Sequence, residues 1–222
     1  MRLLKNRTQN NKLRAIAMLL VMCCLCCAML SYRVANAHCS SYIFLAWNLL
    51  LAIIPLGIAY YLYSYDQRYP GRYFLIIALA LLWLLFLPNA PYIITDFVHL
   101  RTRPNIPLWY DVMLLFAFSV TGLIAGLISL YFIHEVVELL VNKLTGWLFI
   151  GLATVLCGFG VYLGRVVRFN SWDLFTNTWH LLKISILKTG DKTAMGMTLI
   201  VALFMLFSYS LFYAIISIKN TK

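Results

Sequence analysis

Hydrophobic residues form six long runs that fill most of the chain, and polar residues gather at the junctions between them. Runs of about 18 or more apolar residues are typical of helices that span a membrane. The runs are continuously apolar, whereas strands of a membrane barrel alternate apolar and polar positions. The pattern therefore predicts an all-α fold, a polytopic transmembrane helical bundle of about six spans. The predicted spans lie near residues 13–30, 42–62, 73–94, 112–133, 147–163 and 197–218, in a single membrane domain over residues 1–222.

The composition agrees with a membrane protein. Only 11% of the residues are charged, against roughly 25% in soluble domains, and the mean hydropathy is +0.86. The net charge of +11 fits contact with anionic lipid head groups, so membrane lipids are the expected partners. Nucleic acid is not expected, because the chain has no basic soluble domain. A homo-oligomer is compatible with the pattern. No Walker loop or G-x-S-x-G turn is present, and no cofactor is predicted.

The distribution of basic residues predicts the orientation. With the N-terminus in the cytoplasm, the cytoplasmic side carries ten Lys and Arg residues against eight on the outer side. The first span also resembles a secretory signal, since Ala35-Asn36-Ala37 matches an A-x-A cleavage site. Arg33 lies unfavourably close to that site, so we expect an uncleaved anchor.

The first polar junction follows Leu87, where Pro88-Asn89-Ala90-Pro91 interrupts the third span. The next residues place Tyr92, Asp96 and His99 on one stripe of a short amphipathic helix. That helix is expected to lie at the interface or to re-enter the membrane beside a partly wet pocket. The simpler alternative is a helix stop followed by an interfacial anchor.

The second junction follows the fifth span, where Gly160 and Gly164 allow close helix approach. A second interfacial helix is predicted over about 172–187, capped by Asn170 or Ser171. Two arginines beside a helix N-terminus favour an anion site. The alternative is that both arginines extend to lipid phosphates without specificity.

Both junctions lie on the same side of the membrane, because two spans separate them. Their polar side chains are therefore expected to converge on one pocket, formed by residues 88–111 and 164–183, that binds an anionic lipid or a phosphate-bearing head group. The predicted ligand-binding residues are Asn89, Tyr92, Thr95, Asp96, His99, Asp111, Arg165, Arg168, Asn170, Trp172 and Asp173.

Two other functions are compatible with the same residues. An enzyme acting on a lipid-linked phosphate would use His99 as general base or nucleophile and Asp96 or Asp173 as its partner. Its metal-dependent form would add His180, although no metal site is predicted overall. A small permease or channel would use the broken third span. No carboxylate is expected deep inside a span, which argues against ion coupling.

Two further patterns have simple structural interpretations. His134 and Glu138 end the fourth span on the opposite side, and we interpret them as solvated charges at a helix end. Gly122 and Gly126, with Ser119 and Ser129, form a small-residue face suited to helix packing.

The segments 87–100 and 164–173 resemble the two signature segments of an uncharacterised prokaryotic membrane-protein family, domain of unknown function 1361. The resemblance extends roughly from the second span to the last. It implies a multi-pass protein of the bacterial cytoplasmic membrane, and it brings no activity, cofactor or partner.

Overall fold

The computed structural model describes residues 2–37, 41–66, 73–102, 105–169 and 191–220. All the regular elements within these residues except the short turns are helices. They are α1 (Arg2–Ala37), α2 (Phe44–Asp66), α3 (Tyr73–Phe86), α4 (Asn89–Tyr92), the 3₁₀ helix η1 (Ile93–His99), α5 (Leu108–Leu140), α6 (Lys143–Tyr162), the π-helix η2 (Leu163–Val167) and α9 (Lys192–Asn220).

Six helical stretches within the described residues are long and apolar enough to cross a membrane. The predicted all-α, polytopic bundle is therefore confirmed. The stretches are Lys12–Asn36, Phe44–Ser64, Phe74–His99, Leu108–Leu140, Lys143–Val167 and Lys192–Ile218.

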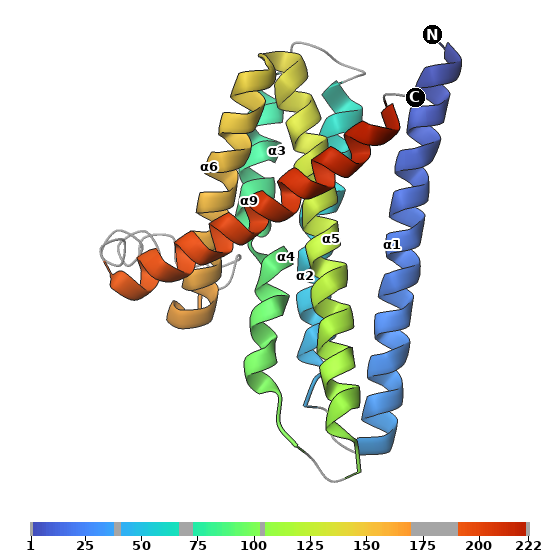
Figure 1. The fold of residues 1–222 in the computed structure, drawn as a ribbon, viewed down its shortest axis with the longest axis vertical. Coiled ribbons are helices and arrows are strands. Elements are labelled where there is room, and N and C mark those ends of the chain that lie inside the picture. Colours follow the sequence, from blue (N-terminus) through green and yellow to red (C-terminus); the bar gives the residue numbers. More distant parts are fainter. Residues whose placement is uncertain (1, 38–40, 67–72, 103–104, 170–190, 221–222) are drawn as a thin grey trace.

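The third stretch differs from the prediction. It continues through the proline-containing break to His99, so the short helix after Pro91 belongs to the same apolar helical stretch. Figure 1 shows α4 and η1 running on from α3 in the same overall direction. The apolar residues of η1 explain the difference, because they keep the stretch hydrophobic beyond the interruption.

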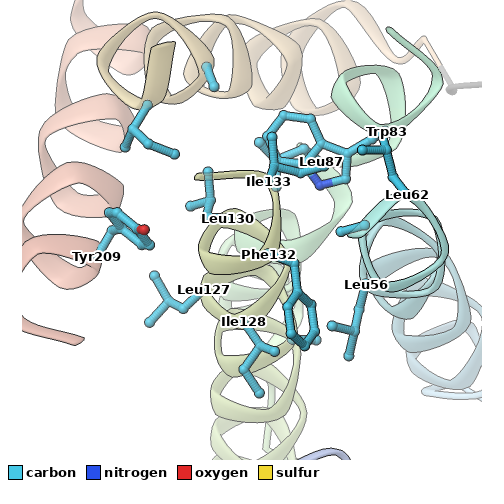
Figure 2. Packing of buried hydrophobic residues seen from close by; sticks show 14 of the residues in the cluster. Leu56, Leu62, Trp83, Leu87, Leu127, Ile128, Leu130, Phe132, Ile133 and Tyr209 are labelled. Carbon is cyan, nitrogen blue, oxygen red and sulfur yellow. The ribbon is translucent and has the colours of Figure 1, made fainter. Parts of the chain in front are cut away.

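Helix α5 is the centre of the bundle. In its apolar window 61% of the residues are buried, against 17% in α1 and in α9. Figure 2 shows apolar side chains of α5 surrounded by residues from α2, α3 and α9. The labelled residues are Leu127, Ile128, Leu130, Phe132 and Ile133 of α5, Leu56 and Leu62 of α2, Trp83 of α3, Leu87 directly after α3, and Tyr209 of α9.

Helix α1 lies at the outer edge of the bundle and is joined to α5 by an ion pair near each end (Figure 1). Lys12 pairs with Glu135 at one end, and Arg33 pairs with Asp111 at the other. At 1.5 Å per residue, Lys12 and Arg33 are about 32 Å apart along α1. This separation is close to the hydrocarbon thickness of about 30 Å, so the two pairs lie near the two membrane surfaces.

The break in the third span packs between two glycine faces. A Cβ atom at Gly126 of α5 would lie 2.7 Å from the Cβ of Ala90, and one at Gly160 of α6 would lie 2.4 Å from the Cγ of Pro88. Gly122 is similarly close to Ile93. The predicted packing role of both small-residue faces is therefore confirmed, and their partner is the broken span.

Side-chain caps define the ends of two helices. Asn142 accepts a hydrogen bond from the amide of Thr145 at 2.8 Å, which begins α6 directly after α5. Asp191 accepts one from the amide of Thr193 at 3.0 Å ahead of α9. The same carboxylate accepts a hydrogen bond from the hydroxyl of Tyr162, which ties the start of α9 to the end of α6.

Candidate functional site

Side chains donate hydrogen bonds to several backbone carbonyls around the proline break. The Asn89 amide donates to the Phe86 carbonyl at 2.9 Å, and the Thr95 hydroxyl donates to the Tyr92 carbonyl at 2.6 Å. The Ser119 hydroxyl, from α5, donates to the Ile93 carbonyl at 3.3 Å. Irregular backbone at membrane depth is tolerated where protein covers it, and these contacts supply that cover.

Arg165 connects η2 to this irregular segment. Its Nη2 donates to the Thr95 carbonyl and lies 3.3 Å from Oδ1 of Asp96. Its Nη1 lies 3.3 Å from the Tyr92 hydroxyl and 3.5 Å from Nε2 of His99. The Arg165 side chain is 19% exposed. Thr95 and the buried Asp96 hold its guanidinium, and part of the side chain remains accessible at the surface.

Asp96 is the buried member of this group, with 1% of its surface exposed. Its second oxygen accepts a hydrogen bond from the Asn48 amide of α2 at 2.8 Å. The two contacts together give the carboxylate a cationic partner and a neutral donor, as a buried charge requires. Asp96 lies three residues before the end of its apolar stretch, so it is a buried carboxylate near a span end.

The stripe predicted for the short helix is also different. In a 3₁₀ helix residues three apart share a face, and Asp96 is buried on the same side as Ile93. The prediction assumed α-helical spacing and placed Ile93 on the opposite face. The tighter winding of η1 removes that separation.

His99 lies at the exposed end of η1 and is not hydrogen-bonded to Asp96. Its ring packs edge-on against Phe44 with centroids 5.3 Å apart, and its carbonyl accepts from the Tyr42 hydroxyl at 3.0 Å. The Asp96 oxygens are used by Asn48 and Arg165. The His99–Asp96 pair of the enzyme interpretation is therefore not formed in this structure, and Asp173, the alternative partner, lies outside the described residues.

Asp111 was predicted to belong to the ligand-binding pocket, but it pairs with Arg33 of α1. It accepts two hydrogen bonds from Arg33, from Nε at 2.7 Å and from Nη2 at 3.1 Å, and both side chains are buried. The Arg33 guanidinium lies 4.1 Å from the ring centroid of Tyr42. Since Tyr42 also contacts His99, this second ion pair is linked to the Arg165 group through a single side chain.

A cavity of about 150 Å³ lies beside the break. It is bounded by residues of α2, the broken span and the end of α6, among them Asn48, Asn89, Tyr92 and Gly164. Gly164 lets the Tyr92 ring approach, because a Cβ there would lie 3.2 Å from the ring. Polar side chains of α2 and α4 therefore face a space large enough for a few water molecules or a small chemical group.

The family whose description is "Protein of unknown function (DUF1361)" matches residues 47–208, most of the chain. The chain belongs to the DUF1361 family. Searches of curated proteins and of solved structures found no match. The DUF1361 region includes Asn48, the proline break, η1 and Arg165, whereas α1 lies outside it.

The remaining predicted residues of the DUF1361 region divide into two groups. Arg168 is exposed, with a left-handed backbone (φ 64°) directly after η2. The predicted helix over about 172–187 lies outside the described residues, as do Asn170, Trp172, Asp173 and His180. The convergence predicted from span parity is thus seen for Tyr92, Thr95, Asp96, His99 and Arg165.

The opposite end of the bundle corrects another expectation. His134 is buried, with Nδ1 2.7 Å from the Tyr209 hydroxyl and Nε2 3.3 Å from Glu138. The rings of Trp147 and Tyr213 pack around it, with centroids 4.9 and 5.4 Å away. The interpretation of His134 as a solvated charge is therefore wrong, because α6 and α9 cover it.

Two residues of the Arg165 group escaped the sequence analysis. Asn48 is a lone polar residue in an apolar span, and Tyr42 lies at the start of the same predicted span. Asn48 could have been recognised from the sequence, because a carboxamide is rare inside an apolar span and needs a polar partner there.

Proposed function

We propose that this integral membrane protein binds a phosphate-bearing head group of an anionic lipid where η1 and η2 meet. The observation that carries the proposal is the fixed guanidinium of Arg165. A group already held in its binding orientation loses less conformational entropy when a ligand arrives. Arginine suits this role because its planar fork matches phosphate oxygens.

The lengths of the Arg165 contacts support exchange with a ligand. Nη2 is anchored by its hydrogen bond to the Thr95 carbonyl, whereas among the described residues Nη1 has contacts of 3.3 Å to Tyr92 and 3.5 Å to His99. Those two distances are longer than the usual 2.7–3.2 Å of a strong hydrogen bond. A phosphate oxygen can replace them and leave the anchored side intact.

Charge also supports an anionic ligand. Asp96 offsets Arg165, and the exposed Arg168 adds a second guanidinium three residues later. His99 and the Tyr92 hydroxyl add polar groups at the same surface. The cavity beside Asn89 lies next to this surface and offers space for part of a head group.

The test compares lipid binding by Arg168→Gln and Arg101→Gln variants, by native mass spectrometry of protein in detergent with dioleoyl phosphatidylglycerol. Arg101 is an exposed arginine just beyond η1 and serves as the matched control. Loss of one charge-assisted contact should weaken binding about tenfold in Arg168→Gln. Arg101→Gln should resemble the wild type.

Equal affinities in the two variants would contradict the proposal. A parallel titration with glycerol phosphate separates a lipid ligand from a free phosphate compound. If glycerol phosphate competes fully at the same concentration, the site recognises phosphate without the lipid chains.

A further inference from the structure

A second, apolar groove lies between α1 and α2, at the end of the bundle opposite the Arg165 group. It has a volume of about 230 Å³. Its lining includes Leu13, Ile16 and Leu20 of α1 and Ile53, Leu56 and Gly57 of α2. Figure 1 shows α1 at the outer edge of the bundle. Its two ion pairs are made to α5, and the groove between α1 and α2 stays open.

The dimensions of the groove fit an alkyl chain. On α1 the lining runs from Leu13 to Cys23, which is about 15 Å at 1.5 Å per residue. That is half of the hydrocarbon thickness of about 30 Å, or one leaflet.

The position of the groove fixes where the head group lies. Lys12 comes directly before Leu13, and its ammonium lies 3.9 Å from the ring centroid of Tyr63 and pairs with Glu135. Charged and aromatic residues at this level mark the membrane surface. A lipid chain in the groove therefore belongs to the leaflet on the N-terminal side.

The charge at this end favours an anionic lipid. Lys12 and the exposed Arg14 flank Leu13 of the groove lining, and Lys143 follows α5 at the same end of the bundle. Basic residues near a membrane surface attract anionic lipids.

We propose that the α1–α2 groove binds one acyl chain of an anionic phospholipid from the leaflet on the N-terminal side. This site is separate from the proposed head-group site, which lies at the other end of the bundle. It joins α1, which is outside the matched family region, to α2 through a bound lipid.

Gly57 provides a direct test. A Cβ at Gly57 would meet nothing within 4 Å, so a leucine there enters the groove without a backbone clash. Gly151 of α6 is equally open and lies outside the groove, which makes Gly151→Leu the matched control. Both changes replace a helical glycine, so their effects on helix propensity are similar.

The measurement is native mass spectrometry of full-length protein with dioleoyl phosphatidylglycerol, alongside thermal unfolding with and without that lipid. Gly57→Leu should bind one molecule about tenfold more weakly than Gly151→Leu and should lose part of the lipid-induced rise in Tm. In lipid-free detergent Gly57→Leu should unfold no earlier than the wild type, which shows that it folds.

Three outcomes would overturn the proposal. Equal phosphatidylglycerol binding by the two leucine variants would show that the groove holds no lipid. Equal binding of dioleoyl phosphatidylcholine would remove the preference for an anionic lipid. Conversion of a dimer to a monomer by Gly57→Leu would identify a second copy as the occupant. Arg168→Gln should leave this site intact, so failure here is distinguishable from failure of the head-group site.

Discussion

Asp96 is a carboxylate with almost no exposed surface, and it depends on Arg165 and Asn48 for its stability as an ion. Removing one member of a buried pair leaves an uncompensated charge, which is far more costly than losing an exposed contact. Arg168 is exposed and is not among the described partners of Asp96. The two arginines therefore have different energetic relations to the same carboxylate.

We predict that Asp96→Asn and Arg165→Gln are strongly non-additive. The double variant should be more stable than the sum of the two single losses by about 1–3 kcal/mol, because each single change already breaks the pair. The free energy of unfolding in detergent, measured by denaturant titration, tests this. Asp96→Asn with Arg168→Gln is the control and should be additive within about 0.5 kcal/mol. Additivity in both pairs would mean that Asp96 and Arg165 are independent.

At the level of single residues, sequence reasoning located a good part of the Arg165 group. Span parity and the stripe after Pro91 selected Tyr92, Thr95, Asp96, His99 and Arg165. The reasoning misplaced Asp111, because its pairing with Arg33 depends on where α1 packs, and periodicity contains no such information. His134 was misjudged for a similar reason, since its burial depends on α9.

Among the elements, the broken third span is the least regular and the most dependent on its neighbours. Pro88 and Pro91 lack amide protons, so α3 cannot continue unchanged into α4. The segment fits because glycines of α5 and α6 leave room for it. Sequence analysis identified the break and both glycine faces, but it assumed α-helical winding where the structure has a 3₁₀ helix.

We predict that Gly160→Ala destabilises the protein by about 1–3 kcal/mol, because its Cβ would lie 2.4 Å from Pro88 and the break would have to shift. Gly151→Ala, on the same helix but with open space around it, should be neutral or stabilising by up to about 1 kcal/mol. Thermal unfolding of the two variants in the same detergent checks the contrast. Equal Tm values would show that α6 moves freely away from the break.

On the scale of the whole molecule, the ion pairs of α1 determine whether that helix is an integral part of the bundle. Arg33 and Asp111 are both buried, and Nη1 of Arg33 has no hydrogen-bond partner among the described residues. Such an incompletely satisfied pair is costly to break but is replaceable by apolar residues. If processing removed residues up to Ala37, Asp111 would be left buried without Arg33.

We predict that Arg33→Met costs about 3–5 kcal/mol and that adding Asp111→Leu recovers most of the loss. Lys12→Met should cost less, because Glu135 keeps its 2.7 Å hydrogen bond from Tyr131 and is partly exposed. Unfolding free energies in detergent test the series, and intact mass of the purified protein tests whether α1 is retained. Unchanged stability of Arg33→Met, or a mass lacking α1, would contradict this role.

The burial of Asp96 has a consequence for how the chain is made. Its ion-pair partner Arg165 leaves the ribosome later. At roughly 5–20 residues per second, the stretch between Asp96 and Arg165 takes on the order of several seconds to synthesise. During that interval the Asp96 carboxylate lacks the cation that offsets its charge, and a lone charge is costly inside a bilayer. We therefore expect the end of the third span to stay in water or in the head-group region until the fifth span has emerged with Arg165.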